Sequence, residues 1–122
     1  MKKILIVDDS KTTRQVLNFS LTDAGFSVTE AIDGLDAVHF LEKDSFDLMI
    51  TDLKMPRMDG LELTRKVRSD EKHRYIPIII LTTESAEDKK QEGKAAGASC
   101  WIVKPFQPEQ LLQVVNMSLE KK

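Results

Sequence analysis

The sequence has 122 residues, of which 41% are hydrophobic and 31% are charged, and its formal net charge is −2. This length fits one globular domain with its own core, and the charge balance lacks the basic excess typical of nucleic-acid binding. The single cysteine, Cys100, excludes an internal disulfide, and no apolar run is long enough for a signal peptide or a membrane span, so we expect a cytoplasmic protein.

The amino-terminal half alternates short strands with amphipathic helices. The run KILIV at residues 3–7 predicts a buried strand, and residues 11–24 carry apolar side chains at helical spacing. Gly25 follows that helix at the usual left-handed stop position. A second strand, SVTEA, and a second helix are predicted at residues 27–31 and 35–42.

The carboxyl-terminal half continues the same alternation. Asp59 with Glu62, and Ser85 with Asp88, have the spacing of capping boxes, which mark helix starts. The predicted strands and helices follow in the order 47–51, 61–69, 76–82, 87–96, 100–103 and 108–121.

The predicted helix at residues 87–96 is unusually polar. Its apolar contacts are limited to Ala86, Ala95 and Ala96, and it contains an internal glycine. Because it can bury little surface, we expect it to be the least firmly packed helix.

Five successive strand–helix units predict an α/β fold, in which helices wrap one parallel sheet through right-handed crossovers. The functional site of such a sheet lies at the carboxyl ends of its strands. Asp8 and Asp9 follow the first strand, and Asp52 follows the third. Thr82 ends the fourth strand and Lys104 follows the fifth, so we expect these five side chains to converge.

The converging residue types suit phosphoryl transfer. Three carboxylates a few ångströms apart need a compensating cation or raised pKa values, and all-oxygen ligands favour Mg²⁺. Lys104 adds a positive charge and Thr82 a hydroxyl donor, which together can offset the repulsion between a carboxylate and a phosphoryl group. Asp52 would be the nucleophile and would form an acyl phosphate.

Each residue also has a plainer interpretation when it is taken alone. The acid pair could end a strand before a helix capped by Ser10, and Asp52 could be an ordinary loop acid. Thr82 could be a β-branched strand residue and Lys104 part of a turn. The joint pattern favours the site, because these residue types rarely coincide at four strand ends.

The blocks ILIVDDS, DLMITDLKMPRMDG, IIILTTE and WIVKPF resemble the signature motifs of response-regulator receiver domains of two-component signalling. The resemblance runs from Lys3 to Leu119, so we expect a single receiver domain, residues 1–122, without an output domain. It implies a flavodoxin-like (βα)5 fold, doubly wound, with strand order 2-1-3-4-5.

The resemblance also implies an acceptor and a metal site. Asp52 would accept a phosphoryl group from a partner sensor histidine kinase. Asp9 and Asp52 would bind Mg²⁺ directly, with Mn²⁺ able to substitute for it. The backbone carbonyl of Lys54 would complete the ligands, and Asp8 would act through water.

Two further roles follow for the switch. Thr82 and Lys104 would contact the phosphoryl group, and the Lys104–Pro105 peptide bond is expected to be cis. Trp101 matches the aromatic residue that moves inward when the threonine is drawn to the phosphate. Because tryptophan is bulkier and its N–H needs a partner when buried, Trp101 could instead stay outward as an interface anchor.

Lys54 and Glu84 are expected to modulate the site. The Lys54 side chain, two positions past the acceptor, could shield the acyl phosphate from water. It could equally be a solvated loop lysine that contributes only its carbonyl.

We therefore expect a phosphorylation switch, with chemotaxis as the leading context. The output protein would bind the face made by the fourth helix, the fifth strand and the fifth helix. We expect a monomer with no nucleic-acid or membrane partner. Residues on or near that face include Lys89, Lys90, Lys94 and Trp101.

Three rival functions are weighed. One is a phosphorelay intermediate, which would pass the phosphoryl group to a histidine phosphotransfer protein. Another is an aspartate-based phosphohydrolase, although such enzymes usually carry a second acid where this chain has Lys54, and they bring a cap domain. The third, an inert interaction domain, leaves the acid, threonine and lysine set unused, so we expect no enzyme beyond self-catalysed phosphoryl transfer and autodephosphorylation.

Overall fold

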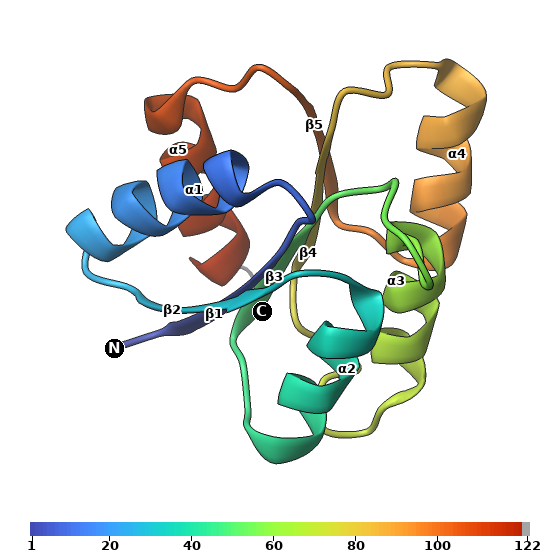
Figure 1. Ribbon diagram of the computed structural model, residues 1–122, viewed down its shortest axis with the longest axis horizontal. Helices are drawn as coiled ribbons and strands as arrows, with labels where there is room; N and C mark the ends of the chain where they lie inside the picture. The colour runs from blue at the N-terminus through green and yellow to red at the C-terminus, as the bar shows by residue number, and fades with distance from the viewer. Residues whose placement is uncertain (121–122) are drawn as a thin grey trace.

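The computed structural model describes residues 1–120 and contains a five-stranded parallel sheet between two layers of helices (Figure 1). The strand order is β2-β1-β3-β4-β5, which confirms the predicted fold class and order. The elements are β1 (Lys3–Val7), α1 (Lys11–Asp23), β2 (Ser27–Ala31), α2 (Gly34–Lys43), β3 (Leu48–Thr51), α3 (Gly60–Ser69), β4 (Ile78–Thr82), α4 (Glu87–Ala96), β5 (Cys100–Val103) and α5 (Pro108–Glu120).

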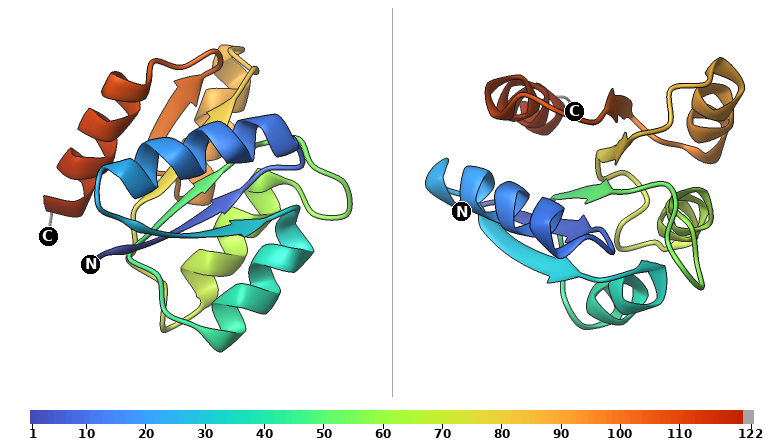
Figure 2. Two further views of the ribbon diagram at one scale, coloured as in Figure 1. Left: turned by 60° about the vertical axis from the view of Figure 1, so that its left-hand side comes forward. Right: turned by 45° about the horizontal axis from the view of Figure 1, so that its top comes forward.

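Both faces of the sheet are covered. Figure 2 shows α1 and α5 on one face, and α2, α3 and α4 on the other. Because side chains alternate along a strand, Ile4 and Ile6 of β1 pack on the first face, whereas Leu5 and Val7 pack on the second. This double burial explains why the central strands read as continuous apolar runs.

Most predicted helix boundaries are confirmed by capping contacts. The Ser10 hydroxyl accepts the Thr13 N–H and starts α1, and Asp59 and Glu62 form the predicted capping box of α3. The glycines after α1 and α4 have left-handed φ angles of 97° and 111°. The predicted end of the last helix at Lys121 lies outside the described residues.

The predicted capping box at Ser85 is wrong. The residue before α4 is Ala86, which makes no side-chain cap, and the helix begins at Glu87. Ser85 therefore lies one position too early to cap the helix. The Ala86 N–H donates to the Glu84 carboxylate. The helix buries only Gly93 and Ala96, which agrees with the predicted weak packing of α4.

Among residues 1–120, no helix combines the length and the apolar character needed to cross a membrane.

Candidate functional site

The predicted acid cluster is present at the carboxyl edge of the sheet. β1 and β3 are neighbours with Val7 opposite Thr51, so both strands end together. The Asp52 N–H donates to the Val7 carbonyl at 2.9 Å, which extends this pairing by one residue. Carboxylate oxygens of Asp8, Asp9 and Asp52 lie within 4.8 Å of one another.

Lys104 reaches the cluster from the end of β5. Its backbone N–H donates to the Thr82 carbonyl at 2.8 Å, which holds the residue beside the end of β4. Its Nζ lies 3.0 Å from Asp8 Oδ2 and 3.4 Å from Asp52 Oδ2. The peptide bond from Lys104 to Pro105 is cis, as predicted.

Burial and the neighbouring charges set the ionisation of the cluster. Burial raises the pKa of the Asp52 carboxyl and the nearby Asp8 carboxylate raises it further, whereas Lys104 partly opposes both effects. Burial alone would lower the pKa of Lys104, but its contacts with Asp8 and Asp52 outweigh that effect and raise it. The lysine is therefore a fixed positive charge beside two acids that repel each other.

The donor set fits a hard divalent cation. The three acids offer only oxygen ligands, and the pKa of Asp52 is raised first by burial and then by the charge of Asp8, which a cation would offset. The three acids are not equally available to a cation. Asp8 is buried and its two oxygens accept the Ser10 N–H and the Lys104 ammonium, whereas Asp9 is exposed.

Thr82, Glu84 and Lys54 form a chain of contacts beside the cluster. Thr82 is buried, and its hydroxyl accepts the Glu84 N–H at 3.3 Å. The Glu84 carboxylate lies 3.7 Å from the ammonium of Lys54, whose side chain is 76% exposed. Sequence reasoning identified the two charged residues as modulators, but it did not predict that they pair across the two loops.

Trp101 is half-buried beneath α4 in this structure. Its indole N–H donates to the Glu84 carbonyl at 3.0 Å, so the polar atom of the ring has a partner. The ring packs beside Leu53, Leu61 and Ile80. The role of Trp101 as a switch stays a prediction.

Sequence reasoning missed one contact near the site. Asp33 was assigned no role, but its buried carboxylate caps α2 and pairs with Arg57 in the loop before α3. An aspartate before Gly34 is a recognisable helix-start signal. The partner could not be found from the sequence, because Arg57 is distant along the chain.

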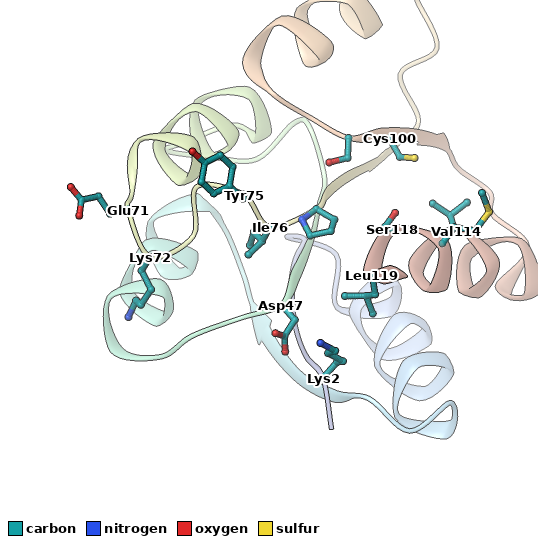
Figure 3. Close-up of a pocket in the computed structure, with 13 residues that line it drawn as sticks. Lys2, Asp47, Glu71, Lys72, Tyr75, Ile76, Cys100, Val114, Ser118 and Leu119 are labelled. Carbon is teal, nitrogen blue, oxygen red and sulfur yellow. The ribbon is translucent and has the colours of Figure 1, made fainter. Parts of the chain in front are cut away.

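A separate cavity of about 550 Å³ opens at the opposite edge of the sheet. Figure 3 shows Ile76, Val114 and Leu119 among the side chains that line it, close to Cys100. It lies at the amino-terminal ends of the strands, away from the acid cluster, so it is not the site of the predicted chemistry.

Comparisons with known proteins agree with this geometry. Residues 4–116 match the family model described as the response regulator receiver domain. The chain is 39% identical over 120 residues to the chemotaxis protein CheY of Pseudomonas aeruginosa, covering 98% of this chain and 97% of that protein. It is 40% identical over 119 residues to the chemotaxis protein CheY1 of Helicobacter pylori, covering 96% of each.

Solved structures of related proteins share the fold. The chemotaxis response regulator CheY4 of Vibrio cholerae superposes with a TM-score of 0.92 and 46% identity, covering 97% of this chain and 98% of that chain. The receiver domain of a sensor histidine kinase from Pseudomonas aeruginosa superposes with a TM-score of 0.91 and 29% identity, covering 98% of each. That second structure holds a magnesium ion coordinated in its active-site cleft.

Proposed function

Because the chain belongs to the response regulator receiver domain family, we propose that Asp52 accepts a phosphoryl group from the phosphohistidine of a partner sensor histidine kinase. The protein is a phosphorylation-switched signalling protein, and its similarity to chemotaxis regulators along nearly the whole chain supports a role in chemotaxis. One observation carries the choice of Asp52: it directly follows β3, and its carboxylate lies in the acid cluster that Lys104 reaches.

The transfer forms an oxygen–phosphorus bond to Asp52 while the nitrogen–phosphorus bond of the donor histidine breaks. Lys104 favours the ionised, nucleophilic form of Asp52, and its charge offsets the repulsion of the incoming phosphoryl group. The Leu53 N–H donates to Asp52 Oδ1 at 2.7 Å and so orients the carboxylate. Thr82 supplies a hydroxyl at the end of the neighbouring strand for a phosphoryl oxygen.

We propose Mg²⁺ as the resident cation, with Mn²⁺ able to substitute. Asp9 and Asp52 would hold it directly with the backbone carbonyl of Lys54. Asp8 would act through water, since it is buried and lies closer to Lys104 than Asp52 does. When bound, the ion supplies positive charge that offsets the charges of the acids and the phosphoryl group. The related receiver domain that holds magnesium in its cleft supports this assignment.

We further propose that the protein turns over no separate substrate and catalyses only its own phosphoryl transfer and autodephosphorylation. Lys54 stands where aspartate-based phosphohydrolases usually carry a second acid, and the matches to chemotaxis regulators also disfavour a phosphorelay intermediate. Transfer of label to a histidine phosphotransfer protein would instead favour the phosphorelay.

The proposed output partner is a protein that binds the face of α4, β5 and α5. That face includes Trp101, and α4 contributes Lys94, which is exposed. Trp101 contacts the same loop that Thr82 holds. A monomeric state and a cytoplasmic location stay predictions.

The proposal is tested by labelling with acetyl phosphate in the presence of Mg²⁺. We expect intact-mass measurement to show the addition of one phosphoryl group to the wild-type protein and none to Asp52→Asn. Asp47→Asn is the matched control, because it makes the same chemical change at the opposite edge of the sheet. Label that persists on Asp52→Asn would place the acceptor elsewhere.

A further inference from the structure

The loop between β3 and α3 is tied to the start of α2 by an ion pair. Arg57, near the tip of this loop, bonds to Oδ2 of Asp33. The Asp33 side chain is 3% exposed and that of Arg57 is 57% exposed. Asp33 Oδ1 accepts the Asp36 N–H at 2.9 Å and caps α2, so both oxygens of this buried carboxylate are engaged. The loop is thereby anchored to the start of α2.

The backbone at Arg57 is in a conformation that needs outside support. Its φ angle is 70°, in the left-handed region that residues other than glycine rarely adopt. Such strained residues persist where surrounding contacts hold them, and they cluster at functional sites. A strained arginine that is paired with a buried acid therefore suggests that the conformation of this loop is important for function.

A second contact holds the same loop against the start of α2. Met58 lies so close to Gly34, the first residue of α2, that a Cβ on that glycine would be 2.7 Å from the Met58 carbonyl oxygen. The base of the loop is closed by the Gly60 N–H, which donates to the Leu53 carbonyl at 2.8 Å. Between these points lies Lys54, whose carbonyl the proposed function assigns to the cation.

We propose that Arg57 is a positioning residue for phosphoryl acceptance: by pairing with Asp33 it fixes the loop that presents the Lys54 carbonyl beside Asp52. This inference rests on the proposed function, because it concerns the same cation site. The pair touches no reacting atom and acts through the backbone of the loop. It is comparable to the partners that orient metal ligands in other proteins, whose loss typically weakens metal binding.

The test uses two variants that break the pair from opposite sides. Arg57→Gly removes the guanidinium and accepts the left-handed backbone without strain. Asp33→Asn removes the charge and keeps a side-chain oxygen to cap α2. Arg65→Gln, an exposed arginine of α3, is the matched control, and Arg57→Lys tests rescue by a conservative change.

Two quantities are measured: Mg²⁺ affinity of the unphosphorylated protein by calorimetry, and the rate of acetyl phosphate labelling as Mg²⁺ is varied. We expect both pair-breaking variants to bind Mg²⁺ about tenfold more weakly. At saturating Mg²⁺ their maximal labelling rates should approach that of the wild type. Arg57→Lys should fall between, and Arg65→Gln should match the wild type.

A purely structural pair would give a different result. The urea midpoint of the variants would fall while their Mg²⁺ affinity and labelling stayed at wild-type values, and that outcome overturns the inference. If Arg57→Gly fails to fold, Asp33→Asn decides the question with the cap retained. A wild-type protein that binds Mg²⁺ but takes no label would instead overturn the proposed function and, with it, the inference.

Discussion

Lys54 connects two loops at the mouth of the site. It follows Asp52 in the loop after β3, and its ammonium lies 3.7 Å from the carboxylate of Glu84 in the loop after β4. An ion pair this exposed contributes little to stability. The position of the Lys54 side chain is more important than the energy of the pair. An acyl phosphate is lost when water attacks in line with the Asp52 oxygen, and we expect this side chain to lie near that approach.

We predict that Lys54→Asn shortens the lifetime of the acyl phosphate. The variant keeps the backbone carbonyl, so Mg²⁺ affinity should change little, but it removes the long side chain that we expect to obstruct the approach of water. A barrier lowered by about 1.4 kcal/mol would speed hydrolysis roughly tenfold. The measurement is the decay of labelled protein at saturating Mg²⁺.

Glu84→Gln is the control for this prediction, because it breaks the ion pair while leaving Lys54 in place. If the lysine itself shields the phosphoryl group, the Gln variant should decay no faster than the wild type. Equal decay in Lys54→Asn and the wild type would leave Lys54 as a solvated loop residue. Slower decay in the variant would mean that the lysine assists the attack.

At the scale of secondary-structure elements, α4 and β5 are fitted together by a glycine and a tryptophan. A Cβ on Gly93 of α4 would lie 2.7 Å from Cζ3 and 2.9 Å from Cε3 of Trp101. The glycine therefore leaves the space that the indole occupies. Its cost to the helix, about 1 kcal/mol relative to alanine, is offset by that packing.

We predict that Gly93→Ala displaces the Trp101 ring. The gain in helix propensity is about 1 kcal/mol, whereas overpacking typically costs about 1–3 kcal/mol, so we expect a small net loss of stability. The indole should become more exposed and lose its bond to the Glu84 carbonyl. A red shift of tryptophan emission, together with urea unfolding followed by circular dichroism, measures both effects.

Trp101→Phe provides the background that isolates this contact. Phenylalanine is smaller than the fused indole, whose six-membered ring meets the added methyl group. Gly93→Ala should therefore be neutral or stabilising in the Trp101→Phe variant. The same loss of stability in both backgrounds would show that the glycine is needed for a reason other than the indole.

The sequence was sufficient to predict some elements and contacts, and the physical reasons are specific. The acid cluster was predictable because parallel strands end at one edge of a sheet, which brings Asp8 and Asp52 together from distant parts of the chain. The bounds of α4 were predicted correctly, but its cap was not, because Ser85 and Asp88 have the spacing of a capping box in a loop that places Ala86 before the helix. The pairing of Asp33 with Arg57 depends on a left-handed backbone angle, which no periodic pattern encodes.

At the scale of the whole molecule, Glu84 is where the site meets the proposed output face. Its N–H is held by Thr82 at the end of β4, its carbonyl by Trp101 of β5, and its carboxylate by Lys54. A change at Thr82 therefore reaches a residue that also contacts β5 and precedes α4. Since α4 buries only Gly93 and Ala96, it is the helix that such a change can shift most easily.

We predict that a phosphoryl mimic changes hydrogen exchange mainly in the loop after β4 and in α4. Drawing the Thr82 hydroxyl toward the mimic breaks its bond to the Glu84 N–H, so amides of residues 83–96 should exchange at a different rate once beryllofluoride and Mg²⁺ are added. The strands of the core and α1 should change little, because their packing does not depend on that bond.

Asp52→Asn with the same additions is the control and should show no response. A change spread evenly over the molecule, or one confined to the residues around the acids, would contradict the idea that the site controls this face.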